Sequence, residues 1–309
     1  MQPSAVSNTT NLTASPSQFY SWHNYRCAYE VHQPINTVSE GIPLLLIHPI
    51  GVGLSRQFWQ RFCREWYNSG QQNPIYNPDL LGCGESDMPH LAYTPSDWAE
   101  QLQYFLQTVV QKPVIVIVQG ALLPVAIELV QKQSNLIAGL VLSGPPTWGL
   151  MTNKSPEWQQ RFVWNLLDSP FGSAFYRYAR TPKFLHSFST RQLFASEYAV
   201  DAEWLNTLVA GAENPASRHA VFSFLAGFWR QDYSISIASI EQPTLALMGE
   251  TASSISQKSK KETPDERLTH YLTCLPQGRG IKINGRNVLP YESTAEFVAA
   301  IATFINEIF

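Results

Sequence analysis

The residues best placed for nucleophilic chemistry lie in a predicted strand-to-helix turn, Gln119-Gly120-Ala121. The turn follows the β-branched run 114–118, which is typical of a buried parallel strand, and precedes apolar residues at helical spacing. In the G-x-S-x-G motif, a turn of this kind exposes a serine nucleophile for acyl transfer. An ungapped alignment places Gly120 at the serine position. Glycine tolerates the strained backbone of such a turn best, but it offers no nucleophile.

Further apolar runs predict the strands around this turn, and two of the turns that follow them carry a recognisable pattern. His48-Pro49-Ile50-Gly51 follows the run 44–47, and the segment 77–87 reads NPDLLGCGESD. These two segments resemble the HG-type loop and the D-x-x-G-x-G-x-S turn of α/β hydrolases. The segments that are similar to family strands extend from about Tyr20 to Ile305: an opening hairpin at 22–31 and strands at 137–146, 242–250 and 279–283.

The resemblance implies the fold class and the domain organisation. The expected fold is an α/β-hydrolase fold, a mostly parallel eight-stranded sheet flanked by helices, with a helical cap inserted after strand six. The core is expected at residues 18–146 and 236–309, and the cap at 147–235, where short helical stretches, one of them at 190–197, alternate with prolines. Residues 1–17, rich in Ser, Thr, Asn and Pro, are predicted to be a disordered tail.

The resemblance also locates the other two catalytic positions. The family's acid ends a G-x-x-D pattern after strand seven, where this chain has Ala252, with Glu250 two residues early. The family's histidine precedes the last helix, where this chain has Asn287. Asn287 has no titratable nitrogen and cannot shuttle a proton near neutral pH. The sequence therefore predicts a degenerate triad at Gly120, Ala252 and Asn287.

Part of the family's binding apparatus is expected to remain. The backbone N–H groups of Ile50 and Ala121 are predicted to form a remnant oxyanion hole, with Gln119 beside it as a ligand-binding residue. Such a pocket would bind a carbonyl or carboxylate group without cutting it. The alternative is that the side chains of Val118 and Leu122 fill the strand-to-helix turn at Gly120, called the elbow here, and leave no cavity.

Composition permits these predictions and excludes some classes of function. The chain has 309 residues and 44% hydrophobic residues, enough for a sizeable core. A net charge of −3 gives no argument for nucleic acid, and the longest apolar window is interrupted by Gln119 and Glu128, which argues against a transmembrane segment. No cofactor or metal is expected, and a cytoplasmic location is the default. The cysteines are expected to be buried reduced thiols: Cys27, Cys63, Cys83 and Cys274.

Three hypotheses about function stay open. The first is a non-hydrolytic pseudoenzyme that binds an apolar or carbonyl-containing small molecule or a protein partner. The second is a hydrolase or lyase that recruits other groups, such as Cys83, Ser86, Asp87 or a cap histidine. The third is an assembly factor without a ligand pocket. Packing of cap on core is the simpler interpretation of the cap tryptophans, with cavity lining as the alternative: Trp158, Trp164, Trp204 and Trp229. The loop at 251–267, with Lys258, Lys260 and Lys261, is interpreted as solvated, with partner binding as the alternative.

Overall fold

The computed structural model describes residues 16–34, 41–254 and 262–309. The predicted tail falls outside these ranges except at its last two residues, and Ser17 accepts a hydrogen bond of 2.7 Å from Nη2 of Arg56. The three lysines of the 251–267 loop also lie outside the described residues.

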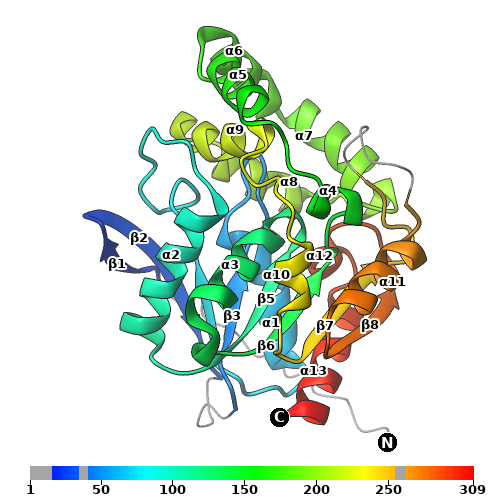
Figure 1. The fold of residues 1–309 in the computed structure, drawn as a ribbon. Helices are drawn as coiled ribbons and strands as arrows, with labels where there is room; N and C mark the ends of the chain where they lie inside the picture. Colours follow the sequence, from blue (N-terminus) through cyan, green and yellow to red (C-terminus); the bar gives the residue numbers. More distant parts are fainter. Residues whose placement is uncertain (1–15, 35–40, 255–261) are drawn as a thin grey trace, which may run out of the picture.

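An eight-stranded sheet forms the centre of the molecule (Figure 1), in the order β1-β2-β4-β3-β5-β6-β7-β8. The pairs β1–β2 and β2–β4 are antiparallel and the other pairs are parallel, which confirms the predicted fold class. The strands are β1 Gln18–Trp22, β2 Tyr25–His32, β3 Leu44–Ile47, β4 Ile75–Pro78, β5 Val114–Gln119, β6 Ile137–Ser143, β7 Thr244–Gly249 and β8 Gly278–Ile283.

The central strands are buried on both faces, which explains their continuous apolar sequences. In β5, Val114, Val116 and Val118 pack into one hydrophobic cluster, while Ile115 and Ile117 pack into a second cluster on the other face. A strand covered on both sides has no solvent face on which polar residues would alternate.

Helices cover both faces of the sheet. Residues of α2 (Pro95–Phe105), α3 (Leu123–Gln133), α10 (Ser234–Ala238) and α11 (Pro264–Cys274) belong to the first cluster. Residues of α1 (Gln60–Asn68), α12 (Leu289–Glu292) and α13 (Thr294–Ile308) belong to the second. Within the described ranges, every helix is too short or too polar to traverse a lipid bilayer.

The segment between β6 and α10, called the cap here, lies over the carboxyl ends of the parallel strands (Figure 1). Its α-helices are α4 Trp148–Thr152, α5 Glu157–Leu167, α6 Pro170–Ala179, α7 Pro182–Phe188, α8 Ala202–Gly211 and α9 Arg218–Ala226. The cap prolines expected to separate helices instead begin them: Pro170 in α6, Pro182 in α7 and Pro215 in a short 3₁₀ turn. Proline is tolerated there because the first turn of a helix needs no N–H donor.

One cap helix was predicted incorrectly. The sequence suggests a helix at 190–197, but the structure has a π-helical turn, Ser189–Leu193, followed by extended backbone at Phe194. The N–H of Phe194 donates to the carbonyl of Ser189 at 3.1 Å and closes the turn.

The turn after β4 holds a buried ionic network. Arg56 and Asp79 are 1% and 0% exposed and form an ion pair, and Nε of Arg56 donates to Glu30 at 2.9 Å. The Asp79 carboxylate also accepts 2.8 Å hydrogen bonds from the N–H groups of Arg56 and Glu85. A Cβ at Gly84 would overlap this carboxylate, which explains the second glycine of the motif.

Candidate functional site

The turn after β5 has the geometry of an elbow. Gly120 has φ +61°, directly after the extended Gln119 and before α3. A Cβ built at Gly120 would meet no other atom within 4 Å. The side of the turn on which a serine would stand is therefore open. Val118 and Leu122, which would fill the elbow under the alternative hypothesis, are buried in the core.

Ile50 and Ala121 follow neighbouring parallel strands. In the β3–β5 register, Ile47 pairs with Val118, and Ile50 and Ala121 each lie three residues further along. Both residues are half-buried. Their N–H groups thus lie after adjacent strand ends at one edge of the sheet, and the remnant oxyanion hole stays a prediction.

Pro49 lies in the same loop, held by His48. Nδ1 of His48 lies 2.8 Å from the Pro49 carbonyl, and Nε2 accepts a hydrogen bond of 3.1 Å from the N–H of Leu80. Burial lowers the pKa of this ring. His48 is thus a neutral histidine with both ring nitrogens in use.

Gln119 joins three strand ends. Its side chain is 2% exposed, its Oε1 accepts a hydrogen bond of 2.6 Å from Ser143, and its Nε2 donates to the Asn287 carbonyl at 2.7 Å. β5, β6 and the loop after β8 are therefore linked through one amide. Both polar atoms of this expected ligand-binding residue have partners within the protein.

The described part of the turn after β7 has Ala252 at the position expected for the acid. Ala252 is 6% exposed, and its N–H donates to Gly249 at 3.0 Å. Glu250 is exposed, and its N–H donates to Ile283 of β8 at 2.9 Å. Ser253, the residue after Ala252, donates its N–H to Oδ1 of Asn287 at 3.3 Å.

Asn287 has a partner for every polar group. Its carbonyl and Oδ1 accept from Gln119 and Ser253, as described above. Its N–H donates to the carbonyl of Leu193 at 3.0 Å, and its Nδ2 donates to that of Gln192 at 2.7 Å. The structure thus brings the three predicted triad positions together, because Asn287 bonds to the direct neighbours of Gly120 and Ala252 and also holds the π-helical turn of the cap.

The residues beside Asn287 strengthen this attachment. Arg286 donates from Nη1 to the Arg191 carbonyl at 2.7 Å and from Nε to Ser253 at 2.9 Å. Glu292 accepts from the N–H of Arg286 at 2.8 Å and from that of Ala195 at 2.6 Å. Sequence reasoning did not identify these contacts, because nothing near positions 286 and 292 in the chain indicates a partner about a hundred residues away.

The alternative nucleophiles in the β4 turn have structural contacts. Burial, with Asp79 nearby, raises the pKa of Cys83 far above its ordinary value, so the thiol stays protonated. Ser86 donates to the Asp79 carbonyl and accepts from the Ala28 N–H, both at 2.9 Å. Asp87 accepts from the N–H of Arg26 at 2.7 Å.

The cysteines and the cap tryptophans differ in exposure. Cys27, Cys63 and Cys83 are buried free thiols as expected, whereas Cys274 is only half-buried. Trp204 and Trp229 are buried, and Trp158 is 72% exposed. The interpretation as packing thus fits Trp204 and Trp229, and Trp158 neither packs on the core nor lines a closed cavity.

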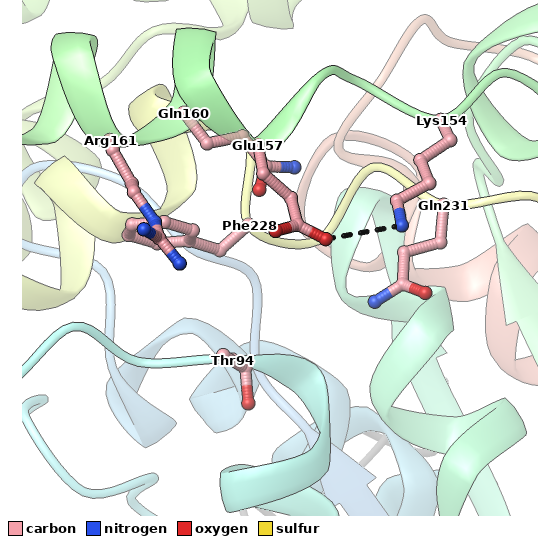
Figure 2. A pocket seen from close by; sticks show the side chains of 7 residues that line it. All are labelled: Thr94, Lys154, Glu157, Gln160, Arg161, Phe228 and Gln231. Carbon is pink, nitrogen blue, oxygen red and sulfur yellow. Dashed lines mark hydrogen bonds and ion pairs between the residues drawn. The ribbon is translucent and has the colours of Figure 1, made fainter.

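Two cavities lie away from the elbow. One of about 250 Å³ separates Thr94 at the start of α2 from cap side chains (Figure 2): Lys154, Glu157, Gln160, Arg161, Phe228 and Gln231. The other, of about 280 Å³, lies between α1 and α8 and is lined mainly by polar groups. Neither contains Gly120, Ala121 or Ile50 among its lining residues.

The outer cap helices carry large apolar side chains in solvent. These side chains lie on α5 and α6, the part of the cap farthest from the sheet (Figure 1). They are 41% to 78% exposed, and together we call them the apolar cap surface: Trp158, Phe162, Leu166, Phe171, Phe175 and Tyr178. Their spacing places them on one face of each helix.

Comparisons with known proteins agree with this architecture. A model described as the alpha/beta hydrolase family matches residues 44–301. An esterase from Thermogutta terrifontis is 16% identical with a TM-score of 0.72, and the match covers 95% of this chain and 99% of the esterase. An enol-lactonase from Burkholderia xenovorans is 12% identical with a TM-score of 0.70, with coverage of 94% and 100%. A search of curated proteins found no match.

Proposed function

The chain belongs to the alpha/beta hydrolase family, and from this premise we propose that it is a non-hydrolytic member that lacks the Ser-Asp-His triad and acts by binding. Asn287 carries the proposal. It occupies the position of the family's histidine, and its amide attaches the cap to the core instead of facing a nucleophile. Loss of the nucleophile or the histidine alone costs roughly 10⁶ in turnover in a serine protease.

The apolar cap surface supports a protein partner as the bound species. Large apolar patches in contact with solvent are rare on monomeric proteins and typically mark interaction sites. Aromatic residues such as Trp158, Phe162 and Phe171 are the types that interfaces favour. We therefore propose that α5 and α6 contact a partner protein through these side chains.

Charge narrows the chemistry of this partner. Residues 154–183 contain five Lys and Arg residues and two acidic residues, in a chain whose net charge is −3. Lys154, Arg161, Arg177 and Lys183 are exposed around or beside the apolar side chains. A partner with an apolar face and an acidic rim would complement both features.

A paired substitution tests this surface. We expect a Phe162→Ser/Phe171→Ser variant to fold, because both side chains are exposed, and to lose the partner that wild-type protein retains in native capture with mass spectrometry. Ile235→Ser is the matched control, because Ile235 is 84% exposed but lies on α10. The proposal requires that wild-type protein and the Ile235→Ser control both retain an acidic partner protein, and that the paired variant loses it.

Two other occupants would contradict the partner proposal. A concentration-dependent dimer in sedimentation velocity, lost in the paired variant, would identify a second copy of the chain instead. Binding of wild-type protein to anionic phospholipid vesicles, again lost in the variant, would identify a lipid surface.

The open space at Gly120 favours a second candidate, a small molecule with a carbonyl or carboxylate group. We expect the N–H groups of Ile50 and Ala121 to lie beside this space, where they would donate hydrogen bonds to such an oxygen. A short-chain carboxylate such as butyrate, and a matching ester, should then raise the melting temperature by mass action. A Gly120→Val variant should abolish the shift, and an equal shift in that variant would exclude the site.

The recruited-enzyme alternative makes a different prediction. Turnover of short and medium acyl esters by wild-type protein would support it and would overturn the non-hydrolytic proposal. The Cys83 thiol stays protonated, the Ser86 hydroxyl has partners on both sides, and the Asp87 carboxylate accepts from the backbone of Arg26, so we expect no turnover.

A further inference from the structure

Three side chains that are far apart in the sequence meet beneath the outer cap helices. His90 lies in the loop between β4 and α2, Asp168 follows α5, and His219 is in the first turn of α9. Nε2 of His90 lies 2.7 Å from Oδ1 of Asp168, and Nδ1 of His219 lies 3.9 Å from the same oxygen. One potential ligand atom from each residue lies within 4.8 Å of the others.

His219 is the unusual member of this cluster. It is 4% exposed, and its Nδ1 is buried without a hydrogen-bond partner. The distance of 3.9 Å to Asp168 is too long for a hydrogen bond. A buried polar atom left unsatisfied is unfavourable, so native proteins normally provide it with a partner. The groups nearest to this nitrogen in the cluster are the Asp168 carboxylate, at 3.9 Å, and the His90 ring, whose centroid lies 4.3 Å from that of His219.

The chemistry of the His219 ring suits a ligand role. Imidazole binds divalent transition-metal ions through a ring nitrogen with a free lone pair, and Nδ1 of His219 has no hydrogen-bond partner.

We propose that His90, Asp168 and His219 form a binding site for one divalent transition-metal ion, with Zn²⁺ as the best match. Two imidazoles and one carboxylate are a common zinc ligand set, whereas Ca²⁺ and Mg²⁺ prefer oxygen ligands alone. A tetrahedral ion with bonds of 2.0–2.1 Å separates its donor atoms by about 3.3 Å. The present spacing requires only modest side-chain movement, and His90 is exposed and free to make it. Solvent would supply the fourth ligand.

Such a site would link the cap to the core. Asp168 separates α5 from α6, the two helices of the apolar cap surface, and His90 belongs to the core. A bound ion would therefore fix the outer cap helices to the core loop. A simple surface ion pair between His90 and Asp168 would explain their 2.7 Å contact but not the unpartnered nitrogen of His219.

Zinc titration of tag-free, chelator-treated protein tests the site. We expect isothermal titration calorimetry to give one Zn²⁺ per chain. His90→Ala and Asp168→Asn should each weaken binding at least tenfold, because each removes a direct ligand. The matched control is His186→Ala, an exposed cap histidine outside the cluster, which should bind like the wild type.

A second measurement guards against loss of folding and adventitious binding. Co²⁺ in place of Zn²⁺ should give the visible absorption bands of a tetrahedral site in wild-type protein and in His186→Ala, but not in folded Asp168→Asn. Absence of stoichiometric Zn²⁺ binding by the wild type would overturn the proposal. Wild-type affinity in both His90→Ala and Asp168→Asn would overturn it as well.

Discussion

The turn after β4 and the strand ends that carry Gly120, Ala252 and Asn287 belong to the same fold and differ in how closely they follow the residue pattern of the family. In the turn, Asp79 and Ser86 occupy the motif positions of the family, and each has polar partners. At these strand ends, the positions expected for the triad hold Gly120, Ala252 and Asn287, and Gly120 has a positive φ.

The physical demands on the two regions explain this difference. Arg56 and Asp79 are buried charges, so loss of either leaves the other uncompensated in a medium that solvates it poorly. A catalytic triad contributes to a reaction and little to folding. The comparison teaches that the fold depends directly on the buried charges of the β4 turn, and that the contacts of Asn287 with the cap give this residue a structural role.

The largest expected effect is in the β4 turn. Asp79→Ala should lower the free energy of unfolding by about 3–5 kcal/mol, because it leaves the Arg56 guanidinium buried without its main partner. Urea denaturation measures this loss. Glu203→Gln is the control, since its ion pairs with Arg61 and Arg64 are solvent-exposed and should be worth at most about 1 kcal/mol. Equal losses in the two variants would remove the basis of the comparison.

The same network should give acid sensitivity. Burial opposes ionisation of Glu30, but contacts with His32 and Arg56 prevail and lower its pKa. A lowered pKa in the folded state contributes stability above the unfolded value of about 4.3, and this contribution is lost as pH falls below it. We expect Glu30→Gln to cost about 2–3 kcal/mol at pH 7.

Urea titrations between pH 7 and pH 3 measure the Glu30 effect. The gap between wild type and variant should narrow toward acid. A gap that is constant with pH would show that the contribution of Glu30 does not depend on its charge.

A smaller loss in the free energy of unfolding is expected at Asn287. Asn287→Ala removes the side-chain bonds to Gln192 and Ser253 and should cost about 1–2 kcal/mol. Hydrogen exchange should become faster at residues 189–195, because this turn loses its attachment. Asn135→Ala, at an exposed site after α3, serves as control. Unchanged exchange at 189–195 would contradict a structural role for Asn287.

The smallest effect is expected at the elbow. Gly120→Ser should cost only about 1 kcal/mol, from the positive φ, because a Cβ there meets no other atom. Gly70→Ser is a matched control, with φ +86° and equally open surroundings in a remote turn. Ester turnover should stay absent in both. A much larger loss at Gly120 would mean that the elbow is closed.

The sequence predicted the central strands closely because they are buried on both faces and therefore read as continuous apolar runs, whereas the first strand of the opening hairpin, expected from Trp22, begins at Gln18. β3 was predicted at its observed bounds, and β5 was one residue longer than expected. The π-helical turn at 189–193 escaped prediction because contacts from Arg286 and Asn287, remote in the chain, hold its backbone.

The positions of Gly120, Ala252 and Asn287 after their strands could be predicted from the sequence, but the contacts around them could not. The amide of Gln119 reaches Asn287 across 168 positions, and His90 meets Asp168 across 78. Only the folded arrangement of strand ends and cap helices brings such residues together, so no local sequence pattern predicts these contacts.

Intact-mass spectrometry of wild-type protein after incubation with a fluorophosphonate probe tests the central claim most directly. An active family esterase run in parallel confirms that the probe is reactive. The account predicts that the mass of this chain stays unchanged, because it places glycine at the position where the family has its nucleophile. One covalent adduct per chain, on any residue, would contradict it.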